Sequence, residues 1–319
     1  MLKEMAVSNH GPGRAEEKSV NPDNMRQDGA FDVVVISPHL DDAVLSVGAL
    51  IARLVAEGRR VEVWTIFTHP PKSTKLAKDR RGFGDYITRR AEDERALARL
   101  GAGYRWLDFS ERIWGEPSLS SAWHVFRTPP SAAFFANSQT LTQTIVSLLN
   151  DSAATVYVPL GIGNHYDHVE VAFASLKGLL ECSAFDRLRF YEDVPYAFAA
   201  GCRRRHFIAR QKKWRTWAAP VWASPILGWF FGYMAWSARG PGIDAYLPIV
   251  NSLDWSVSSE PVGAFESAKL ESLAEYVSQV KASGGMKRIA PLIRRAHATL
   301  NGEPIWSAAP SRTAPETGQ

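Results

Sequence analysis

The sequence predicts an α/β protein with a three-layer, Rossmann-like fold, in which a mainly parallel sheet carries helices on both faces. Between residues 31 and 191, apolar β-branched runs alternate with helix-periodic segments. This order is typical of βαβ units with right-handed crossovers. In addition, two of the expected strands end in short turns that carry histidines and aspartates. Because open α/β sheets bind ligands beyond the carboxyl ends of their strands, the two turns indicate the functional site.

The expected elements follow from hydrophobic periodicity and from the Gly and Pro residues that interrupt it. In chain order, the pattern predicts strands at 31–36, 61–67, 104–109, 154–159 and 187–191 and helices at about 44–57, 89–100, 138–149, 169–180 and 265–280. A long polar loop is expected at about 70–86, and the irregular, aromatic segment 110–137 is expected to form a lid or a pocket wall.

Composition narrows the function classes. The chain has 319 residues, 45% hydrophobic and 22% charged, which fits an ordinary soluble globular protein. The net charge of +4 is scattered apart from two short basic clusters without interleaved aromatic residues, so no nucleic-acid partner is expected. Two cysteines in unrelated contexts exclude a disulfide framework and a cysteine metal site. Residues 1–29 are polar with no apolar core, which predicts a flexible tail, no signal peptide and a cytoplasmic location.

One catalytic domain is expected at 30–290, followed by a C-terminal tail at 291–319. It contains a Trp-rich apolar insert at about 214–240, of which residues 216–238 carry no charge. A hydrophobic hairpin or lid is the first expectation for this insert. A peripheral membrane contact is the second, because the insert is rich in Trp and flanked by Lys and Arg. Its prolines and glycines disfavour a membrane-spanning helix.

The first turn, within 37–46, places an imidazole and two adjacent carboxylates between a strand and a helix. His39 and Asp42 are three residues apart, close enough to hold one metal ion. Asp41 then points elsewhere, free to take a proton from metal-bound water. In the alternative reading, Asp41 or Asp42 caps the helix, as Asp commonly does, and His39 is a polar bystander.

The second turn, at 161–168, repeats this arrangement after another expected strand and contributes His165, Asp167 and His168. Its two glycines let the backbone bend sharply and approach a ligand closely. A polar surface loop is the alternative. The presence of two such turns, each after a strand, favours a shared site.

Together, the two turns supply what amide hydrolysis needs. His39, Asp42 and one histidine of the second turn form a His₂Asp set with an open position, which is typical of catalytic zinc. Bound zinc lowers the pKa of its water to about 7. Asp41 is placed as general base. The remaining histidine can stabilise the oxyanion and protonate the leaving amine, with Asp167 holding its ring.

These motifs resemble those of the PIG-L/LmbE-like zinc-dependent de-N-acetylases. The stretch 38–43 (PHLDDA) is similar to the family's PHPDDE-type motif, and 165–168 (HYDH) is similar to its HxDH motif. Leu40 and Ala43 depart from the first motif without removing a ligand or the base, and indicate a separate branch. The resemblance implies zinc ligands His39, Asp42 and His168, a base Asp41, an acid or oxyanion stabiliser His165, and its orienting group Asp167.

The resemblance extends from about residue 31 to 279. Arg89 and Glu92 match the family's RxxE helix start, whose arginine approaches the sugar. Asp108, at the end of an expected strand, and Tyr196 are further candidate substrate contacts. A solvated loop carboxylate is the alternative for Asp108.

The sequence therefore predicts a zinc-dependent hydrolase that removes an N-acyl group, acetyl above all, from an amino sugar or sugar conjugate. One Zn²⁺ per chain is expected, with Fe²⁺ as the alternative ion. The aromatic insert predicts a substrate with an apolar aglycone or lipid portion. Two alternatives stay open: an amidase of the same family that acts on a thiol-sugar or natural-product conjugate, and a non-catalytic, membrane-associated glycolipid-binding protein.

Overall fold

The computed structural model describes residues 31–71, 84–115, 117–211, 219, 225–282 and 284–311. The predicted tail at 1–29 and most of the predicted polar loop at 70–86 lie outside these ranges.

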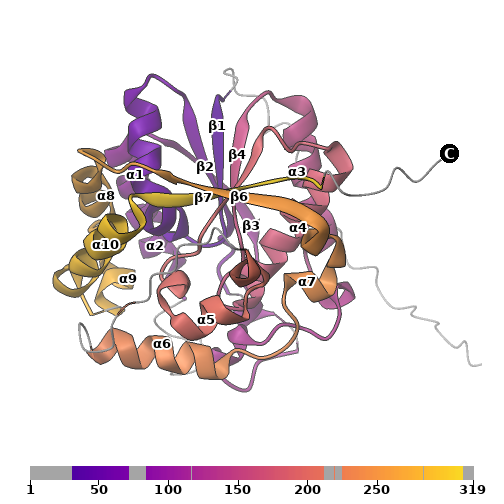
Figure 1. Ribbon diagram of the computed structural model, residues 1–319. Helices are drawn as coiled ribbons and strands as arrows, with labels where there is room; N and C mark the ends of the chain where they lie inside the picture. Colours follow the sequence, from indigo (N-terminus) through magenta and orange to yellow (C-terminus); the bar gives the residue numbers. More distant parts are fainter. Residues whose placement is uncertain are drawn as a thin grey trace, which may run out of the picture. The chain divides into compact units, whose positions relative to one another are not determined.

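A seven-stranded sheet forms the centre of the fold (Figure 1). Its order is β3 (Gly103–Phe109), β2 (Val61–Phe67), β1 (Val33–Ser37), β4 (Thr155–Pro159), β5 (Leu188–Tyr191), β7 (Glu303–Pro310) and β6 (Leu253–Glu260). The first five strands are parallel, while β7 runs antiparallel to both of its neighbours. The predicted mainly parallel α/β fold is confirmed.

Helices cover both faces of this sheet. Figure 1 shows α1 (Asp42–Ala56), α2 (Tyr86–Leu100), α8 (Phe265–Leu273) and α10 (Met286–Leu300) on one side and α3 (Ser138–Asp151) and α4 (Tyr166–Cys182) on the other. The shorter helices are α5 (Ala200–Arg205), α6 (Pro225–Ser237), α7 (Ile243–Tyr246) and α9 (Val277–Ala282). Single 3₁₀ turns lie at Arg112–Trp114, Ala122–Phe126, Ala132–Phe134, Tyr196–Phe198, Phe207–Arg210 and Pro248–Ser252.

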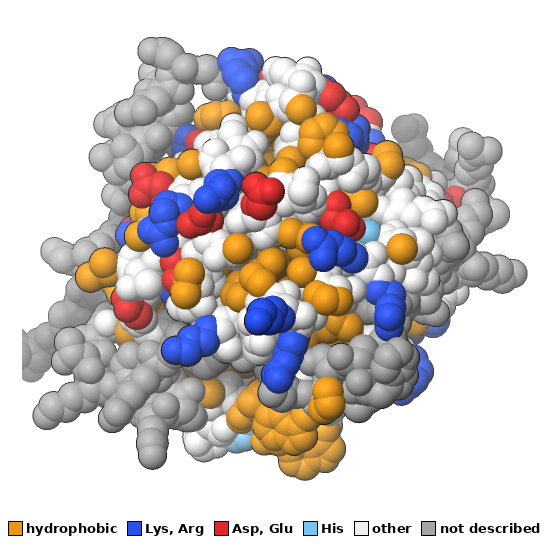
Figure 2. Space-filling view, turned by 90° about the vertical axis from the view of Figure 1, so that its left-hand side faces the viewer, with side chains coloured by type: hydrophobic (Ala, Val, Ile, Leu, Met, Phe, Trp, Pro, Cys, Tyr) orange, Lys and Arg blue, Asp and Glu red, His pale blue; other side chains and the backbone are white. Residues whose placement is uncertain are grey.

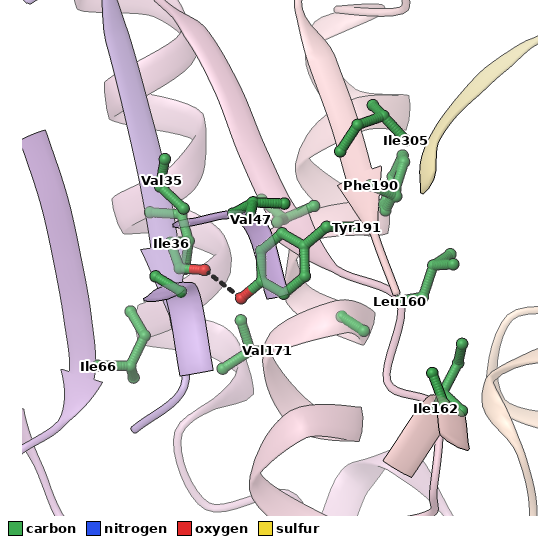
Figure 3. Close-up of a cluster of buried hydrophobic side chains, with 14 of the residues drawn as sticks. Val35, Ile36, Val47, Ile66, Leu160, Ile162, Val171, Phe190, Tyr191 and Ile305 are labelled. Atoms are coloured by element: carbon green, nitrogen blue, oxygen red, sulfur yellow. Dashed lines mark hydrogen bonds between the residues drawn. The ribbon is translucent and has the colours of Figure 1, made fainter. Parts of the chain in front are cut away.

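The central strands are apolar along their length because both of their faces are covered. All five residues of β1 and all seven of β2 are buried. Figure 3 shows how side chains of β1 and β5 meet in this core, where the Tyr191 hydroxyl donates a hydrogen bond to the carbonyl oxygen of Ile36 at 2.8 Å. The phenol is fully buried, so this bond satisfies its one polar group and links two strands that are not neighbours.

The order of the strands determines where the functional turns lie. β1 and β4 are neighbours, but the chain proceeds from β1 to β2 on one side and from β4 to β5 on the other. The loops after β1 and β4 therefore diverge and leave a crevice between them, as at the switch points of open α/β sheets. In Figure 1, α5 and α6 lie beyond this edge of the sheet.

The prediction of a C-terminal tail at 291–319 is wrong. Helix α10 continues to Leu300, and β7 pairs with β5 and β6 inside the sheet. Its Trp306 side chain is completely buried. The small and polar residues of this stretch did not predict a strand, because β7 is stabilised by pairing with its neighbours and not by its own composition. The helix expected at 265–280 is also two helices, α8 and α9, with a turn between them.

The Trp-rich insert contains one described helix, α6, and an aromatic side chain of this helix packs against Trp123. Residues 212–218 and 220–224 lie outside the described ranges. Among the described helices, none has both the length and the apolar character of a membrane span.

Candidate metal centre

The two predicted turns meet at the carboxyl edge of the sheet. The Nδ1 atom of His39, after β1, lies 3.1 Å from Oδ2 of Asp42. The Nε2 atom of His168, in the first turn of α4, lies 3.1 Å from the same oxygen. All three residues are buried, and their ligand atoms lie within 4.8 Å of one another. One small cation can therefore contact all three side chains.

Each histidine is held at its far nitrogen by a second carboxylate. Nε2 of His39 lies 3.0 Å from Oδ2 of Asp167, and Nδ1 of His168 lies 2.7 Å from Oδ1 of Asp193. Such carboxylate–histidine pairs fix the ring orientation and leave the other nitrogen's lone pair for a metal. Sequence reasoning missed Asp193. The available signal was a carboxylate two residues after the end of β5, the strand beside β4.

The hydrogen bonds and charges around His168 are consistent with a cation bound between the two turns. Nε2 of His168 is buried without a hydrogen-bond partner among the described residues, although the Asp42 oxygen is near. Burial disfavours the charged imidazole, but the carboxylates of Asp42 and Asp193 raise the pKa of His168 to about 9. The carboxylates thus favour positive charge at this position. Two imidazoles and one carboxylate with an open position are the donor set of a catalytic zinc site.

Asp41 adopts an unusual backbone conformation beside these groups. Its φ of 130° is rare for a residue with a side chain, and strain of this kind is concentrated at functional sites. The residue precedes α1, but its side chain makes no capping hydrogen bond in the described part of the chain. Burial and the charge of Asp42 raise the pKa of Asp41. The helix-cap alternative is therefore wrong for Asp41.

His165 lies beside the three candidate ligands, with its ring centroid 5.0 Å from that of His39. Burial lowers the pKa of His165 to about 3, so the ring is neutral at pH 7. Its Nδ1 has no hydrogen-bond partner among the described residues and lies 3.9 Å from Asp167, which contacts His39 instead. The expected hydrogen bond, donated by the His165 ring to the Asp167 carboxylate, is thus not formed. A neutral ring N–H suits oxyanion stabilisation better than proton donation.

The predicted substrate contacts divide into two groups. Arg89 is buried, pairs with Glu111 at 3.1 Å and lines the cavity beside His39 together with Tyr196. Asp108 lies outside the set of described residues that line this cavity and instead pairs with Arg90. Because β3 is the edge strand, its end is two strands away from β1. Asp108 thus lies apart from the cavity, and a contact with the substrate stays a prediction for this residue.

The cavity has a volume of about 290 Å³ and is lined by both polar and apolar side chains. At the metal centre it is polar. Its other part is lined by apolar side chains of α1, the loop after β5, α6 and α10: Leu45, Val194, Pro195, Phe198, Leu227, Trp229, Phe231, Ile289, Leu292 and Ile293. A polar reaction centre continuous with an apolar chamber is suited to an amphiphilic ligand.

Comparison with known proteins identifies the domain. Residues 34–178 match the family model of PIG-L, described as GlcNAc-PI de-N-acetylase. The matched residues, less than half of the chain, resemble a PIG-L domain, and the match supports an amidohydrolase of the N-deacetylase type. No sequence among the curated proteins matches the chain.

Several solved structures share the fold of this chain. The A40926 pseudoaglycone deacetylase is 22% identical with a TM-score of 0.57, over 90% of this chain and 100% of its own. The zinc-inhibited form of a teicoplanin deacetylase is 21% identical with a TM-score of 0.58, over 88% and 99%. A deacetylase–teicoplanin complex is 20% identical with a TM-score of 0.55, over 86% and 97%.

The PIG-L match ends within α4. It includes every histidine and aspartate of the metal centre except Asp193, and it excludes α6 and α10. The reacting groups therefore come from the matched region, whereas the apolar walls of the cavity, apart from Leu45, come from the part of the chain that follows it.

Replacing Asp193 with Asn tests how much the second carboxylate contributes. The variant is expected to bind zinc about 10- to 100-fold more weakly, because the His168 ring loses the charge that orients it. Competition with a chromophoric chelator measures this affinity. Asp254→Asn, at an exposed position on β6, is the control and should bind like the unchanged protein. Unchanged affinity in the Asp193 variant would show that this carboxylate does not support the metal ligand.

Proposed function

We propose that this protein is a zinc-dependent N-deacylase that removes an acyl group, acetyl above all, from an amino sugar within a larger conjugate. The observation that carries this proposal is the convergence of His39, Asp42 and His168 at one point, each histidine backed by a carboxylate. When bound there, zinc lowers the pKa of a water molecule and polarises an amide carbonyl.

The chain's own residues have distinct tasks in this reaction. Asp41 faces the cavity beside Asp42 without acting as a helix cap, so it is free to accept a proton from the attacking water. The neutral His165 also lines the cavity, where its ring N–H can stabilise the oxyanion. Arg89, held by Glu111, presents a charged donor group to the sugar hydroxyls.

The apolar part of the cavity supports a substrate that combines an amino sugar with an apolar aglycone or lipid. Two proteins of the same fold are named as an A40926 pseudoaglycone deacetylase and a teicoplanin deacetylase. A free amino sugar would leave the apolar walls from α6 and α10 without contacts. The conjugate is therefore expected to be a better substrate than the free sugar.

A screen of N-acyl amino sugars for released amine tests the function. We expect amine release from N-acetylglucosaminyl conjugates, more from those with an alkyl or aromatic aglycone, and none after treatment with a chelator. Zinc should restore activity to the chelated protein, and Fe²⁺ is the alternative ion to compare. Substrate binding without amine release in the zinc-loaded protein would instead support a binding protein.

Two tryptophans of α6 provide a matched test of the apolar subsite. Trp229 and Trp236 each have 64% exposed surface, but only Trp229 is among the described residues that line the cavity. Trp229→Ala is expected to lower kcat/KM about tenfold for an alkyl glycoside and to leave the free N-acetyl sugar unaffected. Trp236→Ala should change neither value. Equal losses in both variants would contradict an apolar subsite at α6.

The surface around α6 also supports a peripheral contact with an anionic membrane. The segment 194–243 contains no Asp or Glu, and four of its described arginines are exposed: Arg204, Arg205, Arg210 and Arg239. Figure 2 shows hydrophobic side chains gathered at the lower edge of the molecule, at the level of α6 in Figure 1. Exposed Trp beside basic residues is typical of interfacial helices. Flotation with anionic but not neutral liposomes, weakened by either Trp→Ala variant, is the expected result.

A further inference from the structure

Helix α1 is broken in its middle. The backbone amides that follow the break donate their hydrogen bonds to a residue far away in the sequence. Val47 has φ −134° and ψ 26°, outside the helical region. The amides of Ala49 and Leu50 donate to the carboxylate of Glu303, at 3.1 and 2.8 Å. Glu303 belongs to β7 and is 1% exposed. It therefore caps the second half of α1, where a carboxylate satisfies free amides and complements the helix dipole.

A buried lysine completes this arrangement. Nζ of Lys269, on α8, lies 2.7 Å from Oε1 of Glu303, and both side chains are only 2% exposed. The stem of Lys269 crosses α1 at Gly48, where an added Cβ would lie 2.9 Å from the lysine Cγ. The lysine can thus reach Glu303 because Gly48 has no side chain. Because a buried charge without a partner is costly, the pair fixes α1, α8 and β7 relative to one another.

The first half of α1 connects this cluster to the metal centre. It begins with Asp42, directly after Asp41, and ends at the break. Its Ser46 hydroxyl accepts a hydrogen bond from the amide of Val194 at 3.2 Å, one residue after Asp193. The same short segment therefore carries one candidate ligand and contacts the loop that orients His168. A shift of the break would move Asp42 relative to both histidines.

We propose that Glu303 and Lys269 are positioning residues of the metal centre, which hold the break in α1 and thereby the distance between Asp42 and His168. Both lie outside the region matched by the PIG-L family model. The inference concerns the metal site of the proposed function, and its main readout, metal affinity, does not depend on which substrate is hydrolysed.

Replacing Glu303 with Gln tests this proposal. The amide keeps one acceptor for the broken helix but loses the second acceptor and the charge opposite Lys269. We expect zinc affinity to fall about tenfold, by the same logic as for an outer-shell ligand. We also expect kcat to fall while KM stays within about twofold, because Arg89 and the apolar walls from α6 and the loop after β5 are not displaced. Affinity is measured by chelator competition, well below the unfolding temperature of each variant.

Two further variants keep the test decisive. Glu260→Gln breaks an ion pair with Arg53 on the same helix after the break, and it should leave zinc affinity unchanged. If Glu303→Gln does not fold, the double variant Lys269→Met/Glu303→Gln removes both buried charges together and should fold with the same loss of affinity. A variant that melts at lower temperature but binds zinc with unchanged affinity would overturn the proposal, because the pair would then serve stability alone.

Discussion

Replacing Asp41 with Asn is expected to lower kcat by about 10³-fold while the protein keeps its zinc. Asn has nearly the same volume as Asp and is among the residues that tolerate positive φ, so the backbone at 130° is retained. The amide accepts no proton, however, and the attacking water is no longer activated by a base. Amine release from an N-acetylglucosaminyl conjugate gives kcat, and metal analysis gives the zinc content.

The zinc content of the Asp41 variant distinguishes a base from a ligand. Asp41 lies outside the group of His39, Asp42 and His168 that can share one ion, so near-stoichiometric zinc should remain. Glu57→Gln, at an exposed position after α1, is the control and should retain full activity. If the Asp41 variant kept more than about a tenth of the original kcat, the role of general base would be wrong.

The parallel part of the fold could be predicted because its strands are buried on both faces. Such strands appear in the sequence as continuous apolar runs, as in 33–36 and 61–67. β6 and β7 lie at the other end of the sheet, and β6 is only half-buried. The alternation of buried and exposed residues in 253–256 was a usable signal for β6. β7 begins with the buried Glu303, whose charge is satisfied only through tertiary contacts.

The residues of the metal centre also divide into those that the sequence could predict and those that it could not. His39, Asp42 and His168 lie in two local motifs, and the order of βα units brings these motifs to adjacent strand ends. Asp193 reaches His168 because β5 lies next to β4, a relation that no local pattern contains. The contact of Asp167 with His39 instead of His165 likewise depends on how α4 packs against the loop after β1. Spacing alone could identify the metal-binding turns but not the partners of each ring.

Replacing His168 with Ala is expected to abolish both zinc binding and activity, with kcat/KM falling by more than about 10³-fold. The variant loses a buried ring nitrogen that faces Asp42 at 3.1 Å. It also leaves the carboxylates of Asp42 and Asp193 without their shared imidazole, so stability is expected to fall as well. Metal analysis after gel filtration and amine release from a sugar conjugate are the measurements.

Two comparisons separate loss of the metal from loss of the fold. Asp42→Asn keeps the side-chain volume and should also lose zinc, because a neutral amide is a poor ligand for this ion. His124→Ala, at a histidine that pairs with Ser120 outside the cavity, should keep both zinc and activity. A folded His168 variant that still bound one zinc per chain would show that His168 is not a ligand, and would favour the second group of possible ligands, which consists of His39, His165 and Asp167. His165 would then be a ligand and could not stabilise the oxyanion, so the roles proposed for the two histidines of the second turn would be wrong.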